Sequence, residues 1–195
     1  MQTIYSKLLN IILEEIIPPT IISISKGNKI FGAAILKKED LSTVVIGTNN
    51  EIMNPLNHGE VSTIYEYFNL SLNKKIKPQE CIFLSTHEPC SLCLSAITWS
   101  GFDNFYYFFP YNETKDKFNI PHDLNILKEI FKLNNGNYNK VNSYWKCYSI
   151  IDEINKLNDS EKYILTDNIK KIYQEYDKLS KLYQKKKDTN IIPFN

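Results

Sequence analysis

Two short motifs in this chain hold side chains of the types that can bind zinc and move protons. The first is His-Gly-Glu at residues 58–60, and the second is Pro-Cys-Ser-Leu-Cys at residues 89–93. His58, Cys90 and Cys93 are good zinc ligands, and three protein ligands leave the fourth position of the ion open for water, whereas a closed structural site uses four. Glu60 is not needed as a ligand, so its carboxylate is free to move protons. The motifs therefore predict one zinc ion per chain beside an acid–base group.

Helix geometry decides how the motifs can present these side chains. Residues three apart share a helix face, so Cys90 and Cys93 can hold one ion from a first helical turn, which Pro89 is well suited to begin. Residues two apart do not share a face, so His58 and Glu60 must lie where a loop becomes a helix. The partial positive charge of a helix N-terminus favours thiolate over thiol. We expect the metal to lie between two helix N-termini.

Composition limits the class of protein. A chain of 195 residues fits one domain with an appendage, and a net charge of +1 provides no strong field to attract nucleic acid. Four cysteines without a secretory leader indicate metal ligands and buried thiols in a cytoplasmic protein, with Cys81 and Cys147 as inert thiols. No apolar run approaches the ~20 residues of a membrane helix, because Glu14 and Glu15 interrupt the N-terminal one. We expect no membrane partner.

Apolar periodicity predicts the elements that carry the motifs. Helices are predicted at residues 2–17, 58–70, 90–99, 122–132, 144–157 and 160–186, and strands at 29–36, 43–46, 81–85 and 104–109. Pro18-Pro19 is expected to end the first helix, the first two strands to be antiparallel, and no fifth strand is evident. Strands that alternate with helices predict an α/β fold. We expect a catalytic core at residues 1–140, with its motifs at 30–109, and a helical C-terminal extension at 141–195.

The last predicted helix carries a narrow apolar seam. Its members are Leu165, Ile169, Ile172, Tyr176, Leu179 and Tyr183, spaced 4, 3, 4, 3 and 4 residues apart. Such a seam packs either against the helix's own domain or against another helix across a dimer. The extension is therefore expected to pack on the core or on a partner subunit.

Four blocks of sequence resemble the cytidine deaminase-like superfamily, in its branch of cytosine, guanine and transfer-RNA adenosine deaminases. They are Phe-Gly-Ala-Ala-Ile at 31–35, Gly-Thr-Asn at 47–49, Asn-Pro-Leu-Asn-His-Gly-Glu-Val at 54–61 and Thr-His-Glu-Pro-Cys-Ser-Leu-Cys at 86–93. The order H-x-E then P-C-x-x-C is the signature of zinc-dependent nucleobase deaminases. The resemblance implies a three-layer αβα sandwich, zinc on His58, Cys90 and Cys93, and proton transfer by Glu60.

The resemblance also implies contacts to the base and an assembly. Asn49 is expected to contact the base, although the Gly-x-Asn loop is about two residues shorter than usual and Asn50 is an alternative. Phe31 is expected to pack on a flat ring. Members of this family are commonly dimers, so a homodimer is expected. His87 and His122 are interpreted as structural residues.

The sequence is consistent with three functions. The first is hydrolytic deamination of a free base or nucleoside of cytosine or guanine type. The sequence His-Gly-Glu-Val-Ser-Thr at 58–63 favours an aminopyrimidine among these substrates. The second is deamination of adenosine in transfer RNA, which the nearly neutral charge and the lack of a basic stripe disfavour. The third is a zinc-binding module without turnover, and the non-ligand Glu60 argues against it.

Overall fold

A mixed five-stranded sheet forms the centre of the computed structural model, which describes residues 4–72 and 76–194. The strand order is β2-β1-β3-β4-β5. The strands are β1 (Gly32–Lys37), β2 (Thr43–Thr48), β3 (Cys81–His87), β4 (Asn104–Phe109) and β5 (Lys146–Ser149). Strand β1 pairs antiparallel with β2 and β3, whereas β3, β4 and β5 run parallel. The carboxyl ends of the parallel strands therefore meet at one edge, where α/β sheets place their ligand sites.

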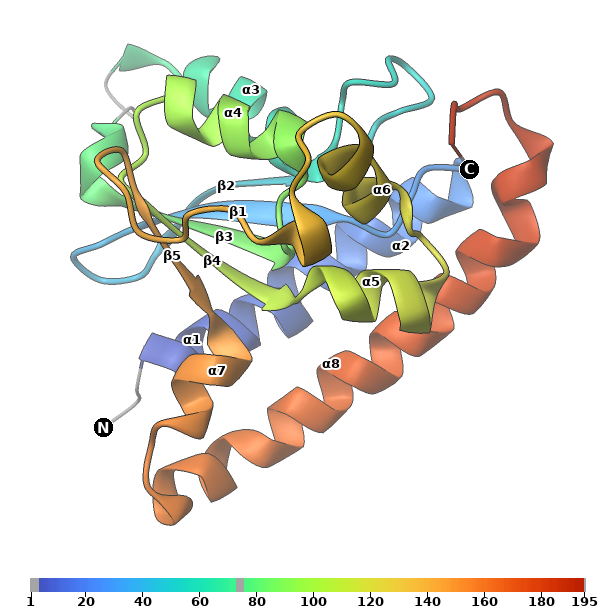
Figure 1. Cartoon of the computed structure of the whole chain (residues 1–195). Coiled ribbons are helices and arrows are strands. Elements are labelled where there is room, and N and C mark those ends of the chain that lie inside the picture. Colours follow the sequence, from blue (N-terminus) through green and yellow to red (C-terminus); the bar gives the residue numbers. More distant parts are fainter. Residues whose placement is uncertain (1–3, 73–75, 195) are drawn as a thin grey trace.

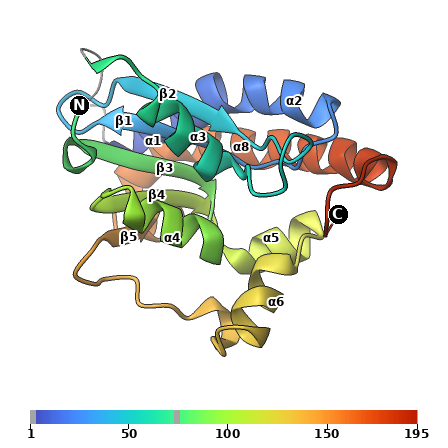
Figure 2. The ribbon, with the colours of Figure 1, turned by 90° about the horizontal axis from the view of Figure 1, so that it is seen from above.

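Helices cover both faces of the sheet (Figures 1 and 2). One face carries α3 (Gly59–Phe68) and α4 (Ser91–Trp99). The other face carries α1 (Ile4–Ile11), α2 (Ile17–Ser25), α7 (Ile150–Asn155) and α8 (Asp159–Lys186). Alternation along β1 supplies both cores, since Ala33 and Ile35 pack with α3 and α4 while Ala34 and Leu36 pack with α1 and α8. The predicted three-layer αβα sandwich is confirmed.

The N-terminal helix is longer than the sequence predicted. Helix α1 continues through a π-helical turn, η1 (Ile12–Ile16), directly into α2, so the prediction that Pro18-Pro19 would end the helix is wrong. Both prolines lie in the first turn of α2, a position where the missing N–H groups are tolerated. The π turn before them shifts the pattern of backbone hydrogen bonds, so the helix continues through the two prolines. Residues 2 and 3 of the predicted helix lie outside the described residues.

This continuous helix also corrects the expectation about apolar runs. By length and composition the segment Ile4–Ser25 could cross a membrane, with a mean hydropathy of 1.5 over its most apolar window. Such a helix near the N-terminus is weak evidence, because buried core helices have the same composition. Here Leu8, Leu9, Ile12 and Ile16 are fully buried in the core that α8 shares. Packing in this core accounts for the apolar composition of the helix.

The segment after β4 differs most from prediction. Residues 111–118, for which no element was predicted, form α5 (Tyr111–Phe118), and α6 (His122–Glu129) follows it. The predicted helix at 144–157 is wrong in its first half, where β5 pairs in parallel with β4, and right in its second half, which is α7. A fifth strand therefore exists. The division between a core at 1–140 and an extension at 141–195 stays a prediction. Strand β5, which completes the sheet, lies after residue 140.

The seam of α8 packs on its own domain. Leu165, Ile172, Tyr176, Leu179 and Tyr183 are buried, and Ile169 packs partly buried against the same cluster. An Asn158–Glu161 capping box begins the helix. Of the two alternatives for this seam, packing within the domain is the one observed.

Two isoleucines of α8 provide a matched test of this packing. Ile172 is 0% exposed and Ile164 is 73% exposed. Because Ile172→Ala leaves a cavity in the core, we expect it to lower the free energy of unfolding by about 2–5 kcal/mol. Ile164→Ala should change it by less than about 0.5 kcal/mol. Urea unfolding measures both, and equal losses would contradict the observed packing.

Candidate active site

Both motifs lie at helix N-termini, as their spacing required. His58 is the N-cap of α3 with φ −62° and ψ 162°, and Cys90 is the N-cap of α4 with φ −64° and ψ 173°. This extended backbone turns each side chain back across the start of its helix. Glu60 lies in the first turn of α3, and Cys93 lies one turn after Cys90. The two helices thus bring four polar side chains to one point.

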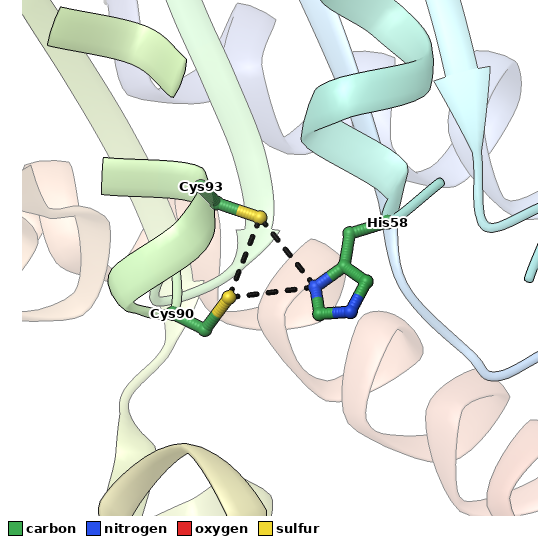
Figure 3. A group of neighbouring side chains, drawn as sticks. All are labelled: His58, Cys90 and Cys93. Atoms are coloured by element: carbon green, nitrogen blue, oxygen red, sulfur yellow. Dashed lines mark hydrogen bonds between the residues drawn. The ribbon is translucent and has the colours of Figure 1, made fainter. Parts of the chain in front are cut away.

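Three of these side chains converge as zinc ligands do (Figure 3). Nδ1 of His58 lies 3.4 Å from Sγ of Cys90 and 3.6 Å from Sγ of Cys93, and the two sulfurs are 3.6 Å apart. A tetrahedral zinc with Zn–S of about 2.3 Å and Zn–N of about 2.0 Å separates its ligands by about 3.5 Å for N–S and about 3.8 Å for S–S. The donor set and its spacing therefore fit one zinc ion.

In the metal-free arrangement the ligands share protons. A hydrogen bond from Cys93 lowers the pKa of Cys90 well below its usual range, while burial raises the pKa of Cys93. Burial acts to lower the pKa of His58, but its contacts with Cys90 outweigh burial and raise it to about 9. Zinc needs two thiolates and a neutral imidazole, so binding must release protons and must weaken as pH falls.

Glu60 is buried beside the ligands. The side chain is 4% exposed, with Oε1 accepting a hydrogen bond from Oγ of Ser85 at 2.9 Å and Oε2 lying 3.2 Å from Sγ of Cys93. Burial, reinforced by the nearby Cys90, raises the pKa of this carboxyl. Its place outside the set of three ligands agrees with a group that takes up and releases protons.

Close backbone contact fixes the start of α3 against the sheet. A Cβ on Gly59 would lie 3.0 Å from the backbone of Gly32 and Phe31, and a Cβ on Gly47 would lie 2.6 Å from the backbone nitrogen of Thr63. Side chains at 59 and 47 would therefore push α3 away from β1 and β2. The missing side chains let His58 and Glu60 reach their positions.

Glu88 fixes the turn that carries Cys90. Its carboxylate accepts hydrogen bonds from the backbone N–H of Tyr111 at 3.1 Å and the hydroxyl of Tyr138 at 2.9 Å, and it lies 3.2 Å from Nζ of Lys140. The side chain is 4% exposed. The Glu-Pro-Cys turn is therefore anchored to the segments after β4, so the acid before the proline has a structural task.

Two connected cavities open onto the ligands. The inner one has about 10 Å³, the room of roughly one water, and is lined by Phe31, His58, Glu60, His87, Glu88, Cys90, Cys93 and Asp123. The outer one has about 360 Å³ and shares Phe31, His58, Cys90 and Asp123 with the inner one. Its apolar wall consists of Phe31, Pro55, Leu56, Leu92, Ile120, Ile126, Pro193 and Phe194. A flat, mostly apolar ligand with a few polar edges suits this shape.

The predicted base contacts have different surroundings. Phe31 lines both cavities. Asn49 is fully buried, donates to Oε2 of Glu51 at 2.6 Å and lines neither cavity, so its contact with a base stays a prediction. His122 lines the outer cavity, where its ring lies 5.4 Å from that of Phe194.

His87 is packed among four aromatic rings beside the inner cavity, and its Nε2 has no hydrogen-bond partner among the described residues. Burial lowers the pKa of His87 to about 3, so the ring is neutral.

Sequence reasoning missed several wall residues. Asp123 faces the zinc ligands from the first turn of α6, and Lys29 and Glu51 line the outer cavity as a buried ion pair. Phe194 comes from the end of the chain. No motif marks these positions, and they meet the site only through tertiary packing.

Comparison with known families agrees with this site. Residues 22–109 match the family model described as the cytidine and deoxycytidylate deaminase zinc-binding region. The matched segment contains all three ligands and Glu60. The segment that carries the candidate site therefore matches the zinc-binding region of this deaminase family. A comparison with curated proteins found no match.

Solved structures of the deaminase fold resemble the chain. Guanine deaminase from Bacillus subtilis is 24% identical, with 67% of this chain and 83% of that chain covered and a TM-score of 0.51. A mutant of the protein NE0047 in complex with 8-azaguanine is 14% identical, with 83% and 80% covered and a TM-score of 0.51. At these identities the likeness shows the fold. A structure from work on transfer-RNA wobble deaminases is 17% identical, with 50% and 74% covered and a TM-score of 0.43, too low to carry an argument.

The four free cysteines provide a matched test of the metal site. Cys90→Ala removes one ligand, so we expect purified protein to lose its zinc, about one ion per chain in the parent, and to become less stable because metal-binding energy is folding energy. Cys147→Ala changes a buried thiol outside the site and should keep the metal. Elemental analysis measures both. Zinc retained by the Cys90 variant would contradict the assigned ligands.

Proposed function

We propose that this protein hydrolytically deaminates a free nucleobase or nucleoside, replacing an exocyclic amine by oxygen and releasing ammonia. The observation that carries the proposal is the inner cavity, where a non-ligand carboxylate faces three zinc ligands at the end of a pocket sized for a small ring. A binding module without turnover has no use for Glu60 in that place.

Glu60 is the proposed proton carrier. Zinc held by His58, Cys90 and Cys93 would supply a water of lowered pKa. In this proposal Oε2 of Glu60 passes one proton of the attacking water to the ring nitrogen, and then passes the second proton of the added oxygen to the amine, which leaves as ammonia as the carbonyl forms. The hydrogen bond from Ser85 holds Oε1, so the carboxylate keeps one orientation while Oε2 exchanges protons.

Glu60→Gln tests this role directly. The amide keeps the size of the side chain but cannot carry protons, so we expect zinc and fold to be retained and kcat to fall by at least about 10²–10⁴-fold. Glu66→Gln, at an exposed position of the same helix, should leave kcat unchanged. Ammonia release under saturating substrate gives the measurement, and a Glu60 variant of near-normal kcat would refute the mechanism.

The outer cavity supports a base as the substrate. Phe31, which lines both cavities, is proposed to pack on the ring. Asn49 is proposed from the family resemblance as a base contact, and in this structure its amide reaches the pocket wall through Glu51. Asp123, which lines both cavities, is proposed to offer its carboxyl group to a polar edge of the ring. The sequence wording favours an aminopyrimidine, while the Bacillus subtilis neighbour is a guanine deaminase. Cytosine and guanine are therefore the first substrates to test.

Transfer RNA is the alternative substrate, and the charges at the pocket disfavour it. Lys29 is paired with Glu51 at 2.8 Å, and burial lowers the pKa of His122, which keeps that ring neutral. Neither of these two side chains of the pocket wall is thus available to neutralise phosphates.

A substrate panel separates the two proposals. Cytosine, guanine, adenine, their nucleosides and a transfer RNA are incubated with the protein, and ammonia release is measured at several salt concentrations. We expect turnover of a base or nucleoside with a rate nearly indifferent to moderate salt. Inosine formed in transfer RNA, with steep salt dependence and no turnover of small substrates, would overturn the proposal.

We further propose a cytoplasmic homodimer. The outer side of α3 and α4 exposes Tyr65, Phe68 and Trp99, with Trp99 91% exposed, and such apolar patches favour association. The four free, buried cysteines suit a reducing compartment. Light scattering should give twice the 22.8 kDa mass of the chain, and a monomer at micromolar concentration would refute the dimer.

A further inference from the structure

A buried ion pair lies behind the histidine ligand. Glu51 is 3% exposed and Lys29 is 6% exposed, with Nζ of Lys29 donating to Oε1 of Glu51 at 2.8 Å. Nδ2 of Asn49 donates to Oε2 of the same carboxylate at 2.6 Å. Burying an ion pair carries a desolvation cost that a pair of apolar side chains would avoid. The pair therefore needs an explanation beyond packing.

The carboxylate of this pair faces the histidine ligand. Nδ1 of His58 points at the two sulfurs, so Nδ1 is the nitrogen that binds zinc. A neutral imidazole whose Nδ1 lone pair binds a metal carries its proton on Nε2. Nε2 of His58 lies 3.7 Å from Oε1 of Glu51. This distance is slightly beyond hydrogen-bond range, so the contact here is electrostatic.

We propose that Glu51 is a positioning residue for the zinc site, acting through His58. Its negative charge favours the tautomer with the proton on Nε2 and holds the ring with Nδ1 toward Cys90 and Cys93. Lys29 and Asn49 hold the carboxylate in place and balance its charge. Metal-binding histidines commonly donate their second N–H to a carboxylate or carbonyl, and removing that partner typically costs 10–100-fold in metal affinity.

The loop between β2 and α3 is built to place this carboxylate. The backbone N–H of Asn50 donates to the carbonyl of Asn57 at 2.8 Å, and the N–H of Ile52 donates to Oδ1 of Asn28 at 2.9 Å. These bonds fix the chain on both sides of Glu51.

Zinc affinity tests the proposal without any substrate. Zinc-free protein is titrated against a chromogenic chelator, and the zinc dissociation constant is compared among variants. Glu51→Met should raise it by about 10–100-fold. Asp103→Asn breaks a half-exposed ion pair with Lys38 at the other end of the sheet and should leave the dissociation constant unchanged.

Variants of Lys29 separate positioning from general stability. Glu51→Met alone leaves a buried cation without its partner and lowers stability, whereas Lys29→Met with Glu51→Met replaces the whole pair by apolar side chains and should recover stability. We expect the double variant to bind zinc as weakly as Glu51→Met, and Lys29→Met alone to lose less zinc affinity than Glu51→Met, because Asn49 still holds the carboxylate. Parent-like zinc affinity in the double variant, or equal loss in Lys29→Met, would overturn the proposal. A protein that binds zinc but deaminates nothing would refute the proposed function and leave this test valid.

Discussion

The close packing of titratable side chains in a buried space is the constraint on which this structure depends. Two thiols, a histidine and the Glu60 carboxylate meet within a few ångströms of one another, away from water. Without a metal, protons must stay on Cys93 and His58, and the pKa of Glu60 rises as well. A divalent cation would remove this conflict, since it would replace the protons on the ligands. The site is therefore a cation site by charge as well as by geometry.

The scaffold supplies the precision that this crowding needs. The glycines at 59 and 47 allow α3 to lie directly on β1 and β2, while Glu88 fixes the turn before α4 to the segments after β4. The same strategy recurs at Glu51, which Lys29 and Asn49 hold behind His58. His58 and the turn before Cys90 thus each lie beside a buried carboxylate that is itself held by two or more partners. Sites held in this way lose function when their supports shift by fractions of an ångström.

The sequence predicted local features better than distant ones. The ligands and Glu60 could be placed at two helix N-termini because their spacings of three and two residues permit few geometries. The double proline misled the prediction, since a π turn before it keeps the helix continuous. Strand β5 has four residues, too short for a periodic pattern. Asp123, Lys29 and Phe194 carry no motif, and only the folded chain brings them to the cavity. Tertiary packing, which a single sequence does not encode locally, decided those positions.

The central claim is that one zinc ion is bound by two sulfurs and one nitrogen, with a fourth position open to water. X-ray absorption at the zinc edge of the purified protein measures this ligand set directly. The structure predicts two sulfurs at about 2.3 Å and two nitrogen or oxygen atoms at about 2.0–2.1 Å. A shell of four sulfurs, or a shell with no sulfur at all, would contradict the account.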